Sequence, residues 1–374
     1  MLHLVIAIPT LNRCNYLKNN IHFFDQQKRP DNVRVSLAIS NSASVDETEQ
    51  YLSELQSSRK DFFLFNEQTG YNRSNYGYLC TAIPDDADWV WFMGDDDYLI
   101  DLEAIKKVCE ILTKYENDEE FAFVHACQAR RSRNTGEVVI DSVANLCNRF
   151  GYTEILGWFS SIIMKKAPFV RALEKTHEHG QIARNEPATG ISVSAFFQSS
   201  YFFEEIYMKK GAFVDSPLVE PQDQEMTSAT RERWQAENMG ERYIYIVDDI
   251  ERLAKIGIPM KNLSERFFRY HKYHLWDRFV MHQINVLLAF GAGDRSELIN
   301  ASMERFARNW QRIQSITNFL YDPVIKKQLY VDIENSIGLC NLFLEKNFDE
   351  QVRELLQRHR DLHSLEAFDF FMLT

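Results

Sequence analysis

The sequence predicts an α/β protein in which a mostly parallel sheet, flanked by helices, is followed by an all-α C-terminal part. Three observations lead to this expectation. Short apolar runs alternate with segments of helical periodicity over the first hundred residues, as in parallel sheets with crossover helices. Polar loops follow each of these apolar runs. After about residue 226 the alternation gives way to long helical patterns.

The first four predicted strands are short apolar runs of the kind found in buried parallel strands, at residues 4–8, 33–39, 62–65 and 89–93. Between them, apolar residues at helical spacing predict helices over 16–24 and around 51–55, the second capped by Asp46, and a short helix after Gly77. Ligands bind such sheets at the carboxyl ends of the strands. The loops that follow the four strands should therefore converge on one site.

The rest of the first part is less regular. We expect a helix at 102–112, a strand at 121–126, a hairpin turn at Thr135-Gly136 between 130–133 and 138–140, a strand within 157–165, a helix near 191–205 and a last strand at 213–219. The predicted domains are 1–225, which is α/β, and 226–374, which is helical. Within the second, helices are expected at 276–290, 295–320, 323–345 and 349–359.

The net charge of −12 is concentrated in the first predicted domain. Residues 1–225 hold 22 Lys+Arg against 33 Asp+Glu, and residues 226–374 hold 20 against 21. A broad basic surface is needed for non-specific nucleic-acid binding, so nucleic acid is not an expected partner. An anionic nucleotide remains possible as a ligand when a divalent ion mediates the contact.

The chain carries no sign of a secreted or membrane-spanning protein. Its six cysteines have no C-x₂-C spacing, so neither a zinc site nor a redox motif is indicated. Its N-terminus has no charged segment or cleavage site of a signal peptide, and no run reaches the roughly 18 apolar residues of a membrane span. We expect a cytoplasmic protein, peripheral to the inner face of a membrane at most.

Three consecutive aspartates, Asp95, Asp96 and Asp97, follow the strand at 89–93 directly. Adjacent carboxylates repel one another, so a fold that gathers them usually supplies a cation. Hard oxygen ligands suit Mg²⁺ or Mn²⁺, which bridge carboxylates to substrate phosphates. The plain alternative is an acidic surface turn. Convergence of the other strand-end loops on the same edge favours the metal site.

Four motifs in this order resemble the nucleotide-sugar-binding half of glycosyltransferase family 2, which has the GT-A fold. They are AIPTLNR at 7–13, ISNSASVDET at 39–48, TGYNRSNYG at 69–77 and WFMGDDDYL at 91–99. The resemblance covers residues 1–100. It implies a nucleotide-sugar donor, usually a UDP-sugar, with a divalent metal on its diphosphate. It also implies inversion at the sugar.

The resemblance also assigns binding residues. It implies nucleotide or donor contacts from Pro9, Thr10, Asn12, Arg13, Asn41, Arg73, Asn75 and Asp95. The position of Asn41 is commonly Asp in the family, and this chain keeps a hydrogen-bonding side chain there without the charge. The metal position falls on Asp96, with Asp95 beside it. Strand alternation would instead pair Asp95 with Asp97 on one face, so all three remain candidate ligands.

The general base should lie between the strand at 157–165 and the next helix. The acidic doublet that family members often have there is missing from the segment 177–187. Glu186 is the first candidate, followed by Asp223 and Glu178, although each also fits a solvated surface carboxylate. His177 and His179 are close enough in sequence for metal binding, but loop histidines more often have no such role. Trp158 could stack on a sugar ring or simply belong to the core.

Basic and aromatic residues alternate in the segment 266–276. This composition is typical of helices that lie on anionic membranes, and also of an amphipathic helix packed on the catalytic domain. As a hypothesis, this segment helps the enzyme reach a lipid-linked acceptor.

Together these features and the family resemblance predict a metal-dependent glycosyltransferase that uses a nucleotide-sugar donor. The resemblance further implies inversion at the sugar and a glycan or lipid-linked acceptor in bacterial surface polysaccharide or glycoconjugate synthesis. One alternative is a catalytically silent nucleotide-sugar-binding or scaffold protein of the same fold. Another is a nucleotidyltransferase, which would need a Gly-rich loop near the first strand. The oligomeric state stays open.

Overall fold

The computed structural model of this chain describes residues 1–67, 76–129, 131–185, 197–222 and 246–260, with two isolated positions at 323 and 327. The chain divides into two compact units, Met1–Met226 and Thr227–Thr374. In the second unit the structure describes one helix, α11 (Ile246–Lys255), with the residues that follow it up to 260. The other helices expected beyond residue 226 lie outside the described residues.

A parallel half-sheet forms the centre of the first unit. Its strands lie in the order β3–β2–β1–β4 and are β1 (Leu2–Thr10), β2 (Val33–Asn41), β3 (Phe62–Asn66) and β4 (Trp89–Phe92). All three pairings are parallel. β1 and β4 are buried along nearly their whole length, which explains why their sequences are continuous apolar runs rather than alternating ones.

The other half of the sheet is mixed. It adds β8 (Ile162–Lys165), β6 (Phe121–Gln128), β9 (Lys210–Pro221) and β5 (Asp97–Leu99) in that order, with β7 (Val138–Ser142) paired to β9. β8 is antiparallel to both β4 and β6, and β9 is parallel to β6. β6 and β9 therefore run in the same direction as β1–β4, so that their carboxyl ends lie at the same edge of the sheet.

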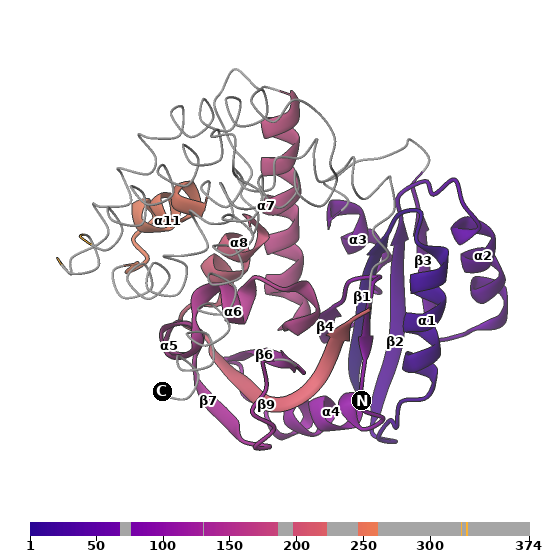
Figure 1. Cartoon of the computed structure of the whole chain (residues 1–374), viewed down its shortest axis with the longest axis horizontal. Coiled ribbons are helices and arrows are strands. Elements are labelled where there is room, and N and C mark those ends of the chain that lie inside the picture. Colours follow the sequence, from indigo (N-terminus) through magenta and orange to yellow (C-terminus); the bar gives the residue numbers. More distant parts are fainter. Residues whose placement is uncertain are drawn as a thin grey trace, which may run out of the picture. The chain divides into compact units, whose positions relative to one another are not determined.

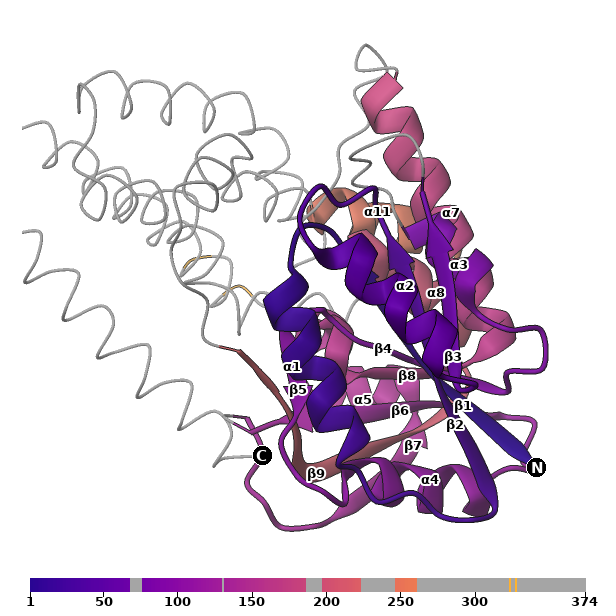
Figure 2. The same cartoon turned by 90° about the vertical axis from the view of Figure 1, so that its right-hand side faces the viewer.

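Helices cover both faces of the sheet (Figure 1 and Figure 2). On one face, alternate β1 side chains such as Leu4 and Ile6 join a buried cluster with α1 (Cys14–Asp25), α2 (Thr48–Ser58) and α4 (Ala104–Lys114). On the other face, Phe92 packs against α7 (Lys166–Asn185) and α8 (Phe197–Ile206), and α3 (Tyr76–Ala82) packs on β1 and β2. Three short elements complete the unit: α5 (Val143–Phe150), α6 (Tyr152–Leu156) and η1 (Phe159–Ser161).

Two expectations about secondary structure were wrong. No helix was expected between the strand at 157–165 and residue 191, but residues 166–185 form the long helix α7. Pro168 does not interrupt this helix, because it lies in the first turn, where its missing N–H is not needed. Residues 138–142 do not pair with 130–133 in a hairpin but with β9. The buried Asp215 carboxylate of β9 accepts hydrogen bonds from Ser132 Oγ, the Arg133 N–H and Thr135 Oγ1, and so ties this loop to β9.

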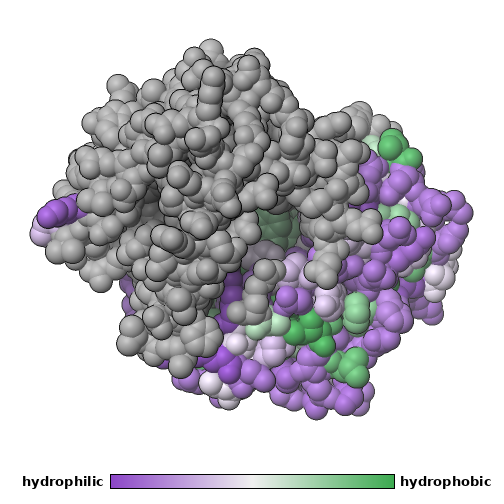
Figure 3. Space-filling view, in the orientation of Figure 1, coloured by the Kyte–Doolittle hydropathy of each residue, from purple (hydrophilic) through white to green (hydrophobic). Residues whose placement is uncertain are grey.

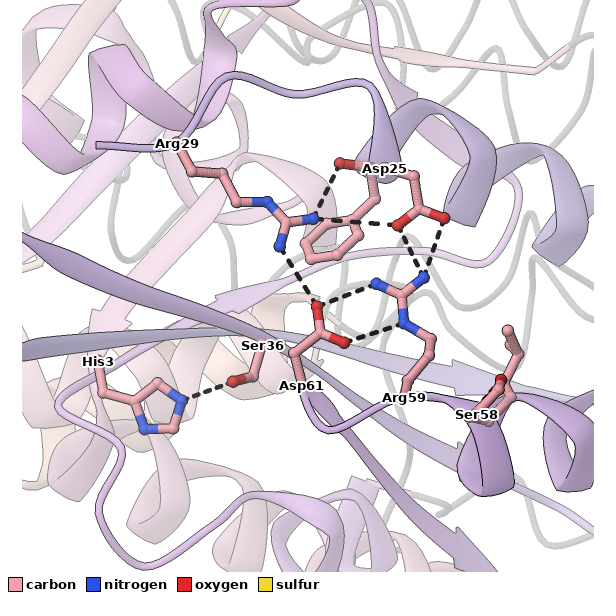
Figure 4. Close-up of polar contacts among 9 residues, drawn as sticks. His3, Asp25, Arg29, Ser36, Ser58, Arg59 and Asp61 are labelled. Carbon is pink, nitrogen blue, oxygen red and sulfur yellow. Dashed lines mark hydrogen bonds and ion pairs between the residues drawn. The ribbon is translucent and has the colours of Figure 1, made fainter. Parts of the chain in front are cut away.

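An ion-pair network ties the amino-terminal edge of the sheet to the helices (Figure 4). Arg59, after α2, donates to Asp25 at 2.7 and 2.9 Å and to Asp61 through Nε and Nη2 at 3.0 Å each. Arg29 reaches Asp61 at 3.3 Å, and its guanidinium carbon lies 4.1 Å from the ring centre of Phe24. Bidentate arginine–carboxylate pairs that form a network are the ion pairs that contribute to stability.

Replacing Arg59 with alanine should lower the free energy of unfolding by about 1–3 kcal/mol, since Asp25 and Asp61 lose their bidentate partner and keep only the longer contacts with Arg29. Urea denaturation followed by circular dichroism measures this loss. The matched control is Arg34→Ala, which removes an exposed pair with Asp86 and should cost less. Equal losses for the two variants would show that the Arg59 network has no special role.

On the face shown in Figure 3, hydrophilic residues cover most of the described surface, with small hydrophobic patches among them. Among the described residues, no helix is long and apolar enough to cross a membrane. The segment 266–276, with its expected basic and aromatic face, lies outside the described residues.

Candidate functional site at the carboxyl edge of the sheet

The register of the parallel strands brings three polar residues into line at the carboxyl edge. Thr10 at the end of β1 pairs with Asn41 at the end of β2, and Asn41 pairs with Asn66 at the end of β3. On the other side of β1, Ala7 pairs with Phe92, and the Met93 N–H donates to the Ala7 carbonyl at 3.0 Å. The acidic triplet therefore follows β4 directly beside Thr10, as expected from the sequence.

The triplet lies in a tight turn, which we call the acidic turn and define as Gly94–Asp97. The Asp97 N–H donates back to the Gly94 carbonyl at 3.3 Å, and Asp97 begins β5. Strand alternation therefore does not govern the side chains of Asp95 and Asp96. A Cβ built on Gly94 would lie 2.7 Å from Asp97 Oδ2 and 3.0 Å from Asp96 Oδ1, so a larger residue at this position would push these carboxylates away from the turn.

Three other elements hold the acidic turn from outside. Asn20 of α1 donates through Nδ2 to the carbonyls of Gly94 at 3.0 Å and Asp97 at 2.6 Å. Ser160 of η1 accepts from the Gly94 N–H at 2.9 Å and donates to Asp97 Oδ2. Gln222, which follows β9, donates its N–H to the Asp96 carbonyl at 2.7 Å. The turn is thus a rigid platform built from residues far apart in the chain.

Sequence reasoning did not single out Asn20, Ser160 or Gln222. The role of Asn20 could have been suspected from the sequence, because it is a polar residue on the face of α1 that buries Leu17, Ile21 and Phe24. A buried amide on an apolar helix face needs partners, and here they are the two carbonyls of the turn. Ser160 and Gln222 left no comparable pattern, since their roles depend on where β8 and β9 enter the sheet.

Asp95 is the structural anchor of the site. Its Oδ2 accepts from Thr10 Oγ1 at 2.9 Å, and its Oδ1 lies 3.1 Å from Arg13 Nη1. Burial raises the pKa of Asp95, an effect that the Arg13 charge opposes. Burial lowers the pKa of Arg13, but the charges of Asp95 and Asp96 outweigh it and raise that pKa above its ordinary value. Arg13 is therefore a permanent cation in this cluster.

Asp96 and Asp97 face different surroundings. Asp96 Oδ2 lies 2.5 Å from Arg13 Nη1, and the Asp96 side chain is 20% exposed against 10% for Asp95. Asp97 is only 4% exposed and points at Ser160. Burial, followed by the negative charge of Asp96, raises the pKa of Asp97 to about 8. Asp96 is thus the member of the triplet that is most open to a ligand.

The loops after β1 and β2 are bonded to each other. Asn12 has a left-handed backbone, with φ of 52°. Its N–H donates to Ser44 Oγ at 2.9 Å, and its side-chain oxygen accepts from the Val45 N–H at 2.7 Å. Asp46 is not the N-cap of α2, which is Glu47 without a side-chain cap bond. Asp46 accepts instead from the N–H of Thr48, the first residue of α2, and from the Cys14 N–H at the start of α1. Two helix N-termini, which attract anions, are therefore fixed beside the acidic turn.

Asn41 turns its carboxamide into the protein. Its side-chain oxygen accepts from the Ser44 N–H at 3.3 Å and from Ser44 Oγ at 2.6 Å, and its Nδ2 donates to Asn66 Oδ1 at 3.1 Å. The residue is 1% exposed. Asn41 thus shapes the β2 loop, and the expected contact with a nucleotide base stays a prediction. Pro9 lies within β1, one residue before Thr10.

Several predicted site residues lie outside the described residues, namely Arg73, Asn75, Glu186 and Asp223. Their expected roles stay predictions. Glu178 is exposed on α7 rather than in a loop. The neighbouring histidines are also on α7 but partly buried, and His179 bonds Tyr201 at 2.8 Å. Trp158 packs on the buried cluster beneath α1 while staying partly exposed, which agrees with a core role and leaves sugar stacking as a prediction.

The residues of the acidic turn fit a divalent cation of the kind that is shared with a substrate. Among the described residues, no group of three or more His, Cys, Asp or Glu side chains could hold a metal by itself. Mg²⁺ and Mn²⁺ are usually held by one or two carboxylates together with substrate phosphates and water. Asp96, closed over the turn by Gly94 and more exposed than Asp95, provides such a hard oxygen ligand.

The raised pKa of Asp97 predicts a pH-dependent stability in the absence of metal. Between the ordinary pKa of 3.8 and about 8, the folded protein keeps a proton that the unfolded chain releases. The free energy of unfolding should therefore fall by up to about 1.4 kcal/mol per pH unit across this window. Asp97→Asn should remove this slope above about pH 6, where Asp95, whose pKa is raised to about 6, no longer contributes. Urea denaturation in EDTA from pH 5 to 8 checks it, and parallel pH profiles for both proteins would contradict it.

No protein-family model matches the sequence, and no curated protein sequence matches it either. Solved structures do match. S. aureus TarS 1–349 in complex with UDP-GlcNAc has a TM-score of 0.51 at 13% sequence identity, covering 90% of this chain and 89% of that chain. A mannosyltransferase from Pyrobaculum calidifontis in complex with GDP-Man and Mn²⁺ has a TM-score of 0.47 at 12% identity, covering 88% and 86%.

Only the first of these scores exceeds 0.5, and that likeness shows a shared fold. In this chain the shared fold comprises a mixed sheet with six strands in one direction. Membership of glycosyltransferase family 2 stays a prediction. This chain has the GT-A fold that its four motifs imply.

Proposed function

We propose that this protein is a metal-dependent glycosyltransferase that moves a sugar from a nucleotide-sugar donor to a hydroxyl group of an acceptor. One observation carries the proposal. On a GT-A fold, Thr10 and Arg13 from the β1 loop are bonded to Asp95 and Asp96 from the β4 turn, at the carboxyl edge where such sheets bind ligands. TarS, which shares the fold, was crystallised with UDP-GlcNAc, and this supports a UDP-sugar as donor.

Asp96 is the proposed metal ligand of the three aspartates. Both oxygens of Asp95 are bonded inside the protein, and Asp97 is turned toward Ser160. Asp96 keeps the most exposed carboxylate. Mg²⁺ or Mn²⁺ bound there would neutralise the negative charge that develops on the departing diphosphate.

The chain's own residues would bind and orient the donor. Arg13, a permanent cation 28% exposed, suits phosphate oxygens, which a guanidinium contacts through two N–H groups. The N-terminus of α1, which follows Arg13 directly, adds positive potential that the Asp46 carboxylate offsets in part. Pro9, Asn12 and Asn41 would shape the nucleoside side of the site, and Arg73 and Asn75 would close it from the loop after β3.

The transfer would be a direct displacement with inversion. The acceptor oxygen forms a bond to the anomeric carbon, the bond from that carbon to the diphosphate breaks, and a carboxylate takes the hydroxyl proton. Glu186 is the first proposed base, ahead of Asp223, and Glu178 is the third choice. Trp158, beside the turn-holding Ser160, would line the sugar or acceptor side.

The proposed setting is the synthesis of bacterial surface polysaccharide or glycoconjugate from a glycan or lipid-linked acceptor in the cytoplasm. The segment 266–276 would then contact the inner face of the membrane. Replacing Arg266, Arg269 and Lys272 together should weaken liposome binding. Unchanged binding and unchanged turnover of a lipid acceptor would remove the membrane role.

A second candidate is a nucleotide-sugar-binding protein without turnover. It is favoured by the inward carboxamide of Asn41 and by the bonding of Asp95 and Asp96 to Arg13 within the protein. Isothermal titration calorimetry with UDP, GDP and UDP-GlcNAc, in Mn²⁺ and then in EDTA, tests the binding step that both candidates share. We expect Mn²⁺-dependent binding of a uridine nucleotide. Equal binding in EDTA would argue against the metal.

A further inference from the structure

A single nitrogen of Arg13 bridges the two carboxylates that would face a metal. Arg13 Nη1 lies 3.1 Å from Asp95 Oδ1 and 2.5 Å from Asp96 Oδ2. Within the described residues, both hydrogen bonds of the guanidinium come from Nη1, and its carbon lies 6.0 Å from the centre of the Tyr16 ring. Arg13 thus supplies the positive charge that lets the acidic turn close in the absence of a divalent ion.

The backbone of Arg13 is fixed, but its side chain has room to move. Asn12 is pinned by the Ser44 hydroxyl and the Val45 N–H, and Arg13 itself precedes α1, where its carbonyl accepts from the Leu17 N–H at 3.0 Å. The side chain beyond Cβ has several rotatable bonds and is 28% exposed. The guanidinium can therefore change partners while the loop that carries it stays in place.

The two contacts of Arg13 differ in how easily they can be given up. Asp95 is almost fully buried and also accepts from Thr10, so its bond to Arg13 compensates a buried charge. Asp96 is the more exposed partner. A divalent ion on Asp96 would repel the guanidinium at this short distance. A diphosphate would attract the guanidinium, because arginine binds phosphate through paired hydrogen bonds.

We propose that Arg13 is an exchangeable counter-ion of the acidic turn: it holds Asp96 when no donor is bound, and passes from Asp96 to the diphosphate when nucleotide and cation bind together. Its bond to Asp95 is kept throughout. This inference rests on the proposed function, and it adds a way in which the same site regulates its affinity for the cation. The cation then binds weakly to the protein alone and tightly with the nucleotide, so the two ligands are coupled.

Replacing Arg13 with a neutral residue tests whether its charge weakens Mn²⁺ binding to the protein alone and couples Mn²⁺ binding to UDP binding. Arg13→Gln keeps a hydrogen-bonding side chain without the cation. We expect this variant of the full-length protein to bind Mn²⁺ alone on the order of tenfold more tightly than the wild type, and to lose most of the coupling between Mn²⁺ and UDP. Free Mn²⁺ measured by electron paramagnetic resonance, with and without saturating UDP, gives both affinities.

Two further variants control the experiment. Arg34→Gln removes an arginine that pairs with Asp86 at the opposite edge of the sheet, and its Mn²⁺ affinity should equal that of the wild type. Arg13→Lys keeps the counter-charge without the paired geometry. It should bind Mn²⁺ alone as weakly as the wild type and UDP more weakly, and it serves if the glutamine variant does not fold.

The outcomes separate the two claims. Equal or weaker Mn²⁺ binding by Arg13→Gln without nucleotide overturns the exchange, while Mn²⁺-dependent UDP binding by the wild type still supports the proposed function. If Arg13→Gln gains Mn²⁺ affinity but the wild type binds no nucleotide, the counter-ion role stands. That result overturns the proposed function and the transfer of Arg13 to a diphosphate.

Discussion

Replacing Asp96 with asparagine should lower the rate of sugar transfer by roughly 10²–10³-fold or more, because the carboxylate proposed to hold the metal against the diphosphate is lost. Asn keeps the shape of the side chain, and the turn is still closed by its bonds to Asn20, Ser160 and Gln222. The fold should therefore survive. Steady-state kinetics over a range of Mn²⁺ concentrations measure the loss, which should appear in kcat and as a higher Mn²⁺ requirement.

Two variants make this result specific to Asp96. Asp97→Asn replaces the neighbouring carboxyl group, which keeps a proton below about pH 8, but not the proposed ligand, so it should keep the Mn²⁺ dependence of the wild type. Asp101→Asn removes an acidic residue paired with Lys107 at the start of α4 and should behave as the wild type. If Asp96→Asn retained full activity and Asp97→Asn lost it, the metal would have been assigned to the wrong aspartate.

Replacing Trp91 with alanine should lower the free energy of unfolding by about 3–5 kcal/mol, the usual cost of truncating a large buried side chain. Trp91 is fully buried in the middle of β4, within the cluster under α1. Its indole N–H also donates to the Ser160 carbonyl at 2.8 Å. Urea denaturation gives the loss, and a value below about 1 kcal/mol would contradict this description of the core.

Trp91→Phe separates packing from the hydrogen bond. It keeps most of the apolar surface but leaves the Ser160 carbonyl without its donor, at a cost of about 1–3 kcal/mol. Ser160 bonds Gly94 and Asp97 of the acidic turn, so this variant should also weaken Mn²⁺-dependent donor binding. A phenylalanine variant with lost stability and unchanged donor binding would show that the turn does not depend on Trp91.

The parallel half of the fold and the site at its edge could be predicted from the sequence for a physical reason. Strands buried on both faces must be continuous apolar runs, as β1 and β4 are, and such runs are visible without a structure. The polar residues that end them then converge by topology alone. Thr10, Arg13, Asp95 and Asp96 were expected at one edge and are bonded to one another there.

The remaining parts depend on contacts between distant residues, which leave little trace in a local pattern. Asp215 of β9 bonds the 132–135 loop although about eighty residues separate them in the sequence, and no turn motif predicts that. Helix α7 was missed because its apolar periodicity is broken by polar residues such as His177 and His179. Asp97 points at Ser160 rather than at a ligand because β8 enters the sheet antiparallel beside β4.

The most direct test of the central claim is the release of nucleoside diphosphate from a panel of nucleotide sugars incubated with the full-length protein, in Mn²⁺ and in EDTA. We expect slow hydrolysis of one donor, a UDP-sugar, in Mn²⁺. Nucleoside diphosphate should be released faster when an acceptor is added, and no release should occur in EDTA. Release that continues unchanged in EDTA would contradict the metal mechanism. If uridine nucleotides bind but no sugar is released from any donor, with or without acceptor, the protein is a binding protein rather than a transferase.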